Sequence, residues 1–334
     1  MSKTTIKDVA KASGYSISTV SNAINNVDVI TPSTKEHILK VAKELNYVPN
    51  INGKLLKAKE SKMIGFFTSS ISGPYFYKLV ETMAKEAEIN GYGLNIFVTT
   101  NRKKLMDNII GGNVDGVIIF EDQWVDEEVI SVLEGTSKKC VFLDRSIEAE
   151  TMTSITFDSF KAGYEATKYL LNLGNRKIIF VDGIESMYDN LQRKQGYEAA
   201  MAEAGFQLTE DDFIQGLFEE NASYIATKAY LHNPNFVRPD AFLASNDLSA
   251  IGTIKGIQSE GMAVPEDIQV MGFDDIDIAE YFQPPLTTVW NPIARQGVLA
   301  VESLLKMLQG EAAPTMTKLE GKLVVRQSTQ FSGK

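Results

Sequence analysis

The first fifty residues of the chain carry apolar side chains at helical spacing, interrupted by single turn residues. Ile6, Val9 and Ala10 form one apolar face, and Thr5 directly before them is a residue type that caps helix N-termini. Gly14 stands where this helix has to end, because glycine adopts the left-handed conformation of a helix C-terminus at little cost. The pattern therefore predicts a short helix followed by a tight turn.

A second short helix is predicted directly after this turn. Ser16 is its expected cap, and Val20 and Ile24, four residues apart, face inward. The outer face then carries Ile17, Ser18, Ser21 and Asn22. Two helices around a glycine turn occur in many globular proteins, but a helix-turn-helix motif also presents side chains to DNA base edges in this way.

A third helix is predicted after a short loop. Thr31 is its expected cap and Pro32 lies in its first turn, where the missing backbone N–H costs nothing. Its inner stripe consists of Ile38, Val41, Ala42 and Leu45.

Residues 51–60 also have helical spacing, but they contain Gly53 and are too few to form a stable helix alone. Two interpretations fit this segment. It is either an interdomain linker or a hinge that folds on DNA. In the second case Leu56 enters between base steps of the minor groove, and Lys54 and Lys57 contact phosphates.

Beyond residue 62 the pattern changes to apolar runs of four to six residues, each followed by a helical period. Such alternation is typical of parallel sheets whose strands are joined by crossover helices. The predicted strands are residues 63–67, 93–98, 116–120, 141–143, 177–181, 240–244 and 268–272. The expected fold is a small all-α head followed by an α/β core of doubly wound parallel sheets.

Charge divides the chain in the same place as the pattern. Residues 1–59 hold nine lysines against four acids, a net charge of +5, whereas the whole chain carries −10 and the remainder therefore −15. A basic head on an acidic body confines any attraction for phosphate to one end of the molecule. The alternative is that these lysines only form a solvated surface.

The composition argues against several classes of protein. No run approaches the roughly 18 apolar residues of a membrane span, and no signal peptide precedes the head, so we expect a cytoplasmic protein. Cys140 lies in an apolar run and is expected to be a buried strand residue. Glycine-rich phosphate loops, nucleophile elbows and metal-ligand clusters are missing, so we expect neither an enzyme nor a cofactor or metal.

The head and the segment after it resemble the LacI/GalR family of sugar-responsive bacterial repressors. Motifs in the core extend the resemblance over essentially the full length: residues 144–145, 192–197, 244–247, 264–268, 272–275 and 284–289. The resemblance implies a helix-turn-helix DNA-binding domain over residues 1–48, a hinge helix or linker over 49–61, and an effector-binding and dimerisation core over 62–334.

Within the core, the resemblance implies two subdomains of the periplasmic-binding-protein type. Their expected boundaries are about 62–160 plus 291–321 for the N-subdomain and about 161–290 plus 322–334 for the C-subdomain. A small effector between them would change their relative tilt and thereby order or melt the hinge, releasing the protein from DNA or recruiting it. A homodimer bound to a near-palindromic operator of double-stranded DNA is the expected assembly.

The motif and the resemblance together give the candidate DNA-binding residues: Thr5, Ser16, Ile17, Ser18, Thr19, Ser21, Asn22, Asn25, Tyr47, Asn50, Lys54, Leu56 and Lys57. Asn22 stands where many family members carry arginine. Because asparagine pairs with adenine and arginine with guanine, we expect a different base at that position of the half-site.

The resemblance likewise gives the candidate effector-binding residues: Tyr75, Phe76, Asp144, Arg193, Phe218, Asn246 and Asp274. Acids near the cleft favour a neutral, hydroxyl-rich sugar, whereas Arg145, Arg193 and Lys194 are compatible with a sugar acid or sugar phosphate. Trp290, near an expected crossover, either lines the cleft or packs at the subdomain junction.

These observations favour a transcriptional regulator, which would bind both DNA and a sugar, over two alternatives. A sugar-binding transport component would explain the core but has no use for a lysine-rich head. An enzyme on a doubly wound sheet would require catalytic motifs that this sequence lacks.

Overall fold

The computed structural model describes residues 4–48, 60–120, 125–136, 138–147, 149, 151–234 and 237–329. The chain divides into two compact units, residues 1–61 and residues 62–334.

The described residues of the first unit, 4–48 and 60–61, form three helices packed around a small apolar core. They are α1 (Ile6–Ser13), α2 (Ile17–Ile24) and α3 (Pro32–Glu44). Val9, Val20 and Ile38, one from each helix, are fully buried against one another. All three predicted helices are therefore confirmed, together with the inward orientation of their apolar stripes.

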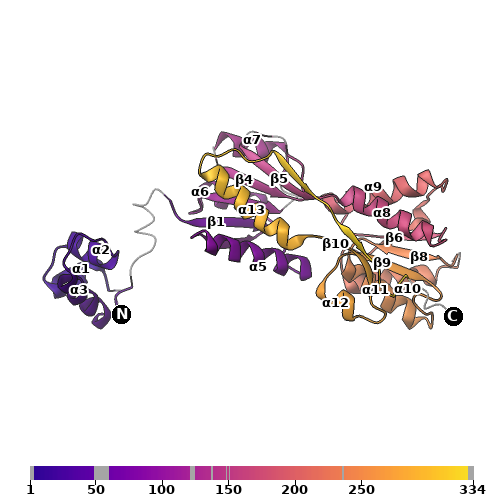
Figure 1. The fold of residues 1–334 in the computed structure, drawn as a ribbon, viewed down its shortest axis with the longest axis horizontal. Coiled ribbons are helices and arrows are strands. Elements are labelled where there is room, and N and C mark those ends of the chain that lie inside the picture. Colours follow the sequence, from indigo (N-terminus) through magenta and orange to yellow (C-terminus); the bar gives the residue numbers. More distant parts are fainter. Residues whose placement is uncertain are drawn as a thin grey trace. The chain divides into compact units, whose positions relative to one another are not determined.

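The second unit contains two six-stranded sheets (Figure 1). The first has the strand order β11-β5-β4-β3-β1-β2, and all of its pairs are parallel. Its strands are β1 (Met63–Thr68), β2 (Gly93–Val98), β3 (Gly116–Phe120), β4 (Lys139–Leu143), β5 (Met152–Phe157) and β11 (Met316–Leu319). Register is set by apolar neighbours such as Phe66 opposite Ile118.

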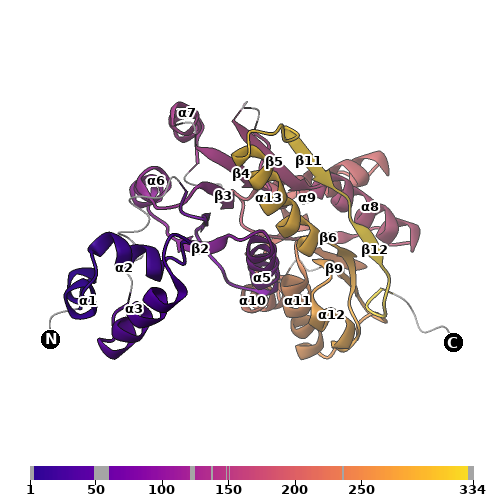
Figure 2. The same ribbon diagram turned by 60° about the vertical axis from the view of Figure 1, so that its left-hand side comes forward.

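Helices cover both faces of this first sheet because its strands are apolar on both sides. Phe66 points into a core under α5 (Pro74–Ile89) and α13 (Ile293–Leu308), which lie side by side in Figure 2. The next residue, Phe67, points into a second core under α6 (Arg102–Gly111) and α7 (Glu127–Gly135). Successive side chains of β1 point to opposite faces of the sheet, so the strand contributes to two separate hydrophobic cores.

The second sheet has the order β12-β10-β9-β8-β6-β7. Its strands are β6 (Ile178–Asp182), β7 (Phe213–Gln215), β8 (Ala241–Ala244), β9 (Gln269–Asp274), β10 (Thr287–Trp290) and β12 (Lys322–Val324). The β10–β12 pair is antiparallel, a departure from the all-parallel expectation, and the other pairs are parallel. The predicted fold class, a helical head with a doubly wound α/β core, is confirmed.

Two further helix layers enclose this sheet. One consists of α8 (Ser159–Asn172) and α9 (Tyr188–Glu203), and the other of α10 (Glu220–Leu231), α11 (Asp247–Ser259) and α12 (Asp277–Tyr281). A short 3-10 turn, Glu210–Asp212, precedes β7. None of the helices in the described part of the chain is long and apolar enough to cross a membrane.

The chain passes between the two sheets three times. It leaves the first sheet after β5, returns to it after β10, and leaves it again between β11 and β12 (Figure 1). The three connections lie close together: a Cβ at Gly321 would stand 2.8 Å from both the Phe157 ring and Val289 Cγ1. Glycine is therefore required where the last connection crosses the other two.

Candidate functional site

The turn between α1 and α2 has the geometry that the sequence predicts. Gly14 has φ 76° and ends α1 in the left-handed conformation. The Ser16 hydroxyl accepts a hydrogen bond from the Thr19 backbone N–H at 3.2 Å and so caps α2. At the start of α1, the Asp8 carboxylate accepts hydrogen bonds from the Thr5 N–H and hydroxyl, which closes a capping box.

One face of α2 is available for recognition. Ile17 is 46% exposed and Ser18 is exposed, while Ser21 and Asn22 are half-buried. The opposite face, with Val20 and Ala23, is buried in the core of the head. The four predicted base-reading side chains therefore share the face that points away from the core.

The other candidate DNA-binding residues have mixed environments. Thr19 is half-buried with its hydroxyl 2.9 Å from Ser16 Oγ, and Asn25 Nδ2 donates to Ser21 Oγ at 3.3 Å. Thr5 is exposed, and Tyr47 packs partly against the core of the head. The remaining candidates lie outside the described residues: Asn50, Lys54, Leu56 and Lys57.

In the core, the first sheet contributes a buried polar cluster around Asp144, at the end of β4. Its carboxylate accepts hydrogen bonds from the Phe157 N–H and from Gln296 Nε2, each at 3.0 Å. The Tyr75 hydroxyl lies 2.8 Å from Asp144 Oδ2 and 2.7 Å from Gln296 Oε1. Burial raises the pKa of Asp144, although these hydrogen bonds oppose the shift.

The second sheet contributes another polar cluster, around Arg193 of α9. Arg193 is only 2% exposed. Its guanidinium donates to the Ser245 carbonyl and, at 3.3 Å, to Asp274 Oδ1, while Asp189 Oδ2 lies 3.6 Å away. Asp274 also accepts from Asn291 Nδ2 at 3.2 Å. The Arg193 cation therefore lies between two carboxylates, one hydrogen-bonded to it and one at ion-pair distance, and the acids outnumber it.

Close helix packing explains how Arg193 is positioned. A Cβ at Gly163 of α8 would clash with the Arg193 backbone carbonyl, and a Cβ at Gly196 would clash with the Phe160 carbonyl. The two glycines let α8 and α9 approach until their backbones touch. The Arg193 guanidinium then lies 5.0 Å from the centre of the Phe273 ring.

A cavity of about 200 Å³ lies between the loops at the ends of the two sheets, and we call it the effector cavity. It is lined by Ser70, Ser72, Gly73, Pro74, Tyr75, Phe76, Phe120, Ile184, Met187, Asp189, Leu217, Phe218, Glu219, Asn246, Leu248 and Ile276. Four candidates are among them. Phe76 packs edge-on against Phe120, and Phe218 accepts a hydrogen bond from Asn246 Nδ2 on its carbonyl at 3.1 Å.

The other three candidates do not line this cavity. Asp144, Arg193 and Asp274 are buried, whereas Tyr75 and Asp189 belong both to the lining and to the two polar clusters. The three buried charged residues are therefore linked to the cavity through the Tyr75 hydroxyl and the Asp189 carboxylate.

Three residues of these clusters were missed from the sequence: Asp189, Asn291 and Gln296. Asp189 lies one helical turn before Arg193, a spacing that would have indicated it. Its side chain is 20% exposed. Burial, opposed by Arg193 and reinforced by Asp144 and Asp274, raises the pKa of its carboxyl group to about 6.

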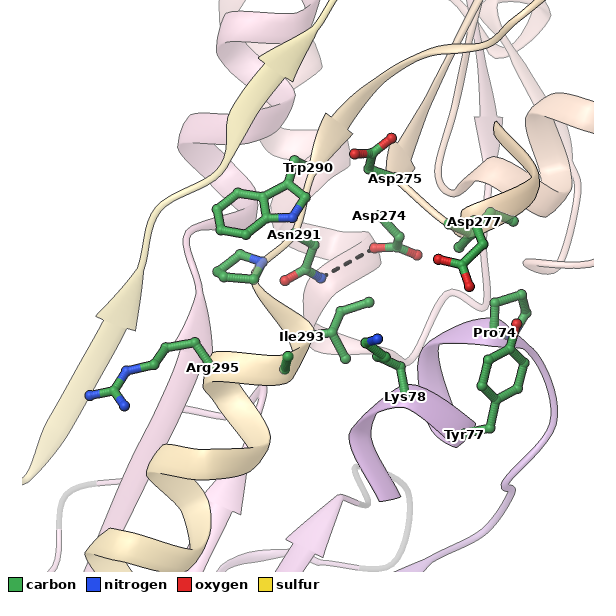
Figure 3. Close-up of a pocket in the computed structure, with 13 residues that line it drawn as sticks. Pro74, Tyr77, Lys78, Asp274, Asp275, Asp277, Trp290, Asn291, Ile293 and Arg295 are labelled. Carbon is green, nitrogen blue, oxygen red and sulfur yellow. Dashed lines mark hydrogen bonds between the residues drawn. The ribbon is translucent and has the colours of Figure 1, made fainter. Parts of the chain in front are cut away.

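A second cavity, of about 330 Å³, lies beside the connection between β10 and α13, and we call it the crossover cavity. Figure 3 shows Trp290 and Asn291 on this connection, with the Asn291 amide on Asp274 and Arg295 pointing away. Trp290 is 37% exposed, and Lys322 Nζ lies 5.6 Å from the centre of its indole. Trp290 therefore lines the crossover cavity rather than the effector cavity.

Two expectations concern chemistry outside the cavities. Cys140 is a buried residue of β4, as predicted, and burial raises the pKa of its thiol to about 12. Among the described residues, no group of three potential metal ligands is found.

Two protein-family models match the chain. Residues 5–50 match the model of bacterial regulatory proteins, lacI family, and residues 167–329 match the model of the periplasmic binding protein-like domain. The first match covers the head that a transport component would not need, so it favours the regulator over that alternative.

Relatives of similar length are named as repressors. The probable HTH-type transcriptional repressor ExuR of Bacillus subtilis (strain 168) is 32% identical over 329 residues, which cover 98% of each chain. The HTH-type transcriptional repressor PurR of Histophilus somni (strain 129Pt) is 31% identical over 331 residues, covering 98% of this chain and 99% of the relative.

Solved structures agree with these relatives. The Lac repressor dimer bound to operator and the anti-inducer ONPF superposes with a TM-score of 0.84 at 26% identity, covering 98% of this chain and 99% of that chain. The complex of the transcriptional regulator CelR with cellobiose gives a TM-score of 0.73 at 26% identity, with 98% and 100% covered.

Proposed function

The chain belongs to the lacI family of bacterial regulatory proteins, and on this basis we propose that it represses a carbohydrate-utilisation operon under the control of a small sugar-like effector. One observation carries the proposal. The same chain holds a complete helix-turn-helix head and a core cavity backed by a buried Arg193–Asp274 pair. Regulators need both parts, whereas transport components and enzymes need only the second.

The exposed face of α2 would enter the major groove. Ile17 and Ser18 at its N-terminal end, with Ser21 and Asn22 one turn later, are placed to reach base edges. The lysines of the head would contact phosphates and make binding strongly dependent on salt. Residues 49–61 would form the hinge, with Leu56 in the minor groove and Lys54 and Lys57 on the backbone.

The effector cavity suits a small hydroxyl-rich molecule. Its aromatic walls, Tyr75, Phe76, Phe120 and Phe218, can pack against the C–H faces of a sugar ring. Asn246 and Asp189 offer polar groups for hydroxyls, with Arg193, Asp144 and Asp274 behind them. Cellobiose in the CelR complex and ONPF in the Lac repressor complex support a carbohydrate as the class of ligand.

Control would arise because the cavity is built from both halves of the core. We assign about 62–160 plus 291–321 to an N-subdomain and about 161–290 plus 322–334 to a C-subdomain. A ligand that contacts Tyr75 on one side and Asn246 on the other stabilises one relative tilt of the two. The three connections between the sheets would act as the pivot.

We further propose a cytoplasmic homodimer on a near-palindromic operator. Tyr77 on α5 and Ile278 and Tyr281 on α12 are large apolar side chains that are at least half exposed. Such residues favour a protein interface over a solvated surface. The Lac repressor, a relative in fold, is a dimer on its operator.

Selection of bound sequences from a random pool of double-stranded DNA tests the proposal. The full chain should enrich a near-palindrome, and its affinity should fall steeply with salt concentration. Sugars, sugar acids and sugar phosphates added to the selected operator should then reveal an effector. Enrichment of no sequence, with and without this panel, would contradict the assignment of the head.

A further inference from the structure

The charges around the effector cavity are unequal in number. Three carboxylates, those of Asp144, Asp189 and Asp274, face one guanidinium, that of Arg193. Asp274 and the Ser245 carbonyl already occupy the two terminal nitrogens of Arg193. The remaining nitrogen, Nε, is buried and has no hydrogen-bond partner. Arg193 is only 2% exposed and does not line the cavity, so its guanidinium lies behind the lining rather than facing a ligand.

The cavity lining itself carries acids and no cation among the described residues. Its two ionisable carboxylates are Asp189 and Glu219, and neither lysine, arginine nor histidine lines it. Lys194, which follows Arg193 on α9, instead pairs with Asp182 at 2.7 Å. The sequence left both neutral and acidic sugars open because it counted Arg145, Arg193 and Lys194 as available charges. None of these three cations lines the effector cavity, which removes that support for an acidic ligand.

Asp189 is the acid best placed to act on a ligand. It lines the cavity, its side chain is 20% exposed, and its carboxylate lies 3.6 Å from Arg193, one turn further along the same helix. A partly exposed carboxylate accepts hydrogen bonds from hydroxyl groups and repels another carboxylate or a phosphate, most strongly where water is excluded.

We propose that Asp189 is a specificity-determining residue that selects an uncharged, hydroxyl-bearing effector and rejects sugar acids and sugar phosphates. The proposal rests on the proposed function, since it concerns the ligand of the same cavity. It narrows that function to effectors without negative charge. Asp189 accepts a hydrogen bond from a ligand hydroxyl, and Arg193 holds the carboxylate in place for this contact.

Matched pairs of ligands test the inference with the full chain. Glucose, galactose and mannose are compared with their uronic acids, and cellobiose and lactose with their aldonic acids, by calorimetric titration at pH 7.5. At this pH the Asp189 carboxyl group, whose pKa is about 6, is ionised. In the pair that contains the tightest ligand, the neutral member should bind at least tenfold more tightly than the acid.

Variants separate the role of Asp189 from the general charge of the protein. Asp189→Asn keeps the size of the side chain and should reduce the preference for the neutral ligand severalfold. Asp189→Ser removes the carboxylate in a smaller side chain and should act in the same direction. Glu185→Gln makes the same change in charge at an exposed position outside the lining and should leave the preference unchanged.

Each outcome bears on a different claim. An acid that binds as tightly as its neutral partner, or a preference that survives both Asp189 variants, overturns this inference and leaves the sugar-responsive regulator intact. If no ligand of either charge binds, the sugar effector of the proposed function is overturned, and this inference with it.

Discussion

The Arg193 guanidinium and the Asp274 carboxylate form a buried ion pair, with Nη2 and Oδ1 3.3 Å apart and side-chain exposures of 2% and 8%. Buried pairs of this kind contribute little net stability, but removing one partner leaves an uncompensated charge in a poorly hydrated site. The pair joins α9 to the end of β9, so it also fixes the second-sheet wall behind the effector cavity.

Replacing the arginine should therefore be costly for stability. We expect Arg193→Ala to lower the free energy of unfolding by about 3–5 kcal/mol, because Asp274 and Asp189 lose their cation. Arg238→Ala is the matched control, since Arg238 is exposed and pairs with Asp267 at 3.7 Å; its cost should stay below about 1 kcal/mol. Urea unfolding curves measure both. Equal losses would show that burial of the pair is unimportant.

Stability should depend on pH through Asp189. Its pKa is raised from 3.8 to about 6, so its contribution to stability is complete below about pH 4 and is lost as pH rises through 6. A shift of this size corresponds to about 3 kcal/mol. The groups that face it are Arg193, Asp144 and Asp274.

The Asp189→Asn variant cannot titrate at this position, so comparison with the wild type isolates the effect. The difference in unfolding free energy, variant minus wild type, should rise by up to about 3 kcal/mol between pH 4 and 6 and be flat above. A difference that stays flat between pH 4 and 6 would refute the pKa shift of Asp189.

The sequence predicts the helical head almost completely, because local signals decide it. Ser16 and Thr31 cap their helices and Gly14 ends α1, each through contacts within four residues. Strands rich in Val, Ile and Phe, such as β3, were equally clear. The β5 strand, with the sequence MTSITF, was missed because its burial depends on neighbouring β4 and β11 rather than on its own hydrophobicity.

The candidate site was predicted as a set of residues but not as an arrangement. Tyr75 and Gln296 are 221 positions apart in sequence, yet they share a hydrogen bond through the way α5 and α13 pack on one sheet. The resemblance placed Arg193 and Asp274 near a ligand. That they bond each other behind the cavity, with Asp189 in front, follows from the α8–α9 packing, which no local pattern encodes.

Asn22 provides a test of the DNA-reading face of α2. Asparagine makes two hydrogen bonds to adenine, whereas arginine makes two to guanine, and each such pair discriminates against other bases by about 1–3 kcal/mol. We expect Asn22→Arg to change the preferred base at one position of each half-site from adenine to guanine, and Asn22→Ala to relax it. Selection from a random DNA pool measures both. If the selected consensus sequence is unchanged in both variants, Asn22 does not contact a base.

Leu56 lies outside the described residues, and its role in the hinge is a prediction from the sequence. If it enters the minor groove, Leu56→Ala loses about 2 kcal/mol of apolar burial, or about thirtyfold in affinity, on the specific operator only. Leu55→Ala is the matched control and should have a smaller effect. Binding to operator and to random DNA at equal salt distinguishes the two. Equal losses of affinity for operator and for random DNA would show that Leu56 does not insert into the minor groove.

The central claim is that a small molecule in the effector cavity controls operator binding, and one measurement tests it directly. The dissociation constant of the selected operator is determined at fixed salt, with and without a saturating sugar, for the wild type, Asp274→Asn and Asp211→Asn. Asp274 backs the cavity, whereas Asp211 is an exposed residue that is not part of its lining.

We predict that the sugar changes operator affinity at least tenfold in the wild type and in Asp211→Asn, a coupling of about 1.4 kcal/mol or more. Asp274→Asn should bind the operator normally and lose the response. A full response in Asp274→Asn, or operator affinity that no sugar changes in the wild type, would contradict the account.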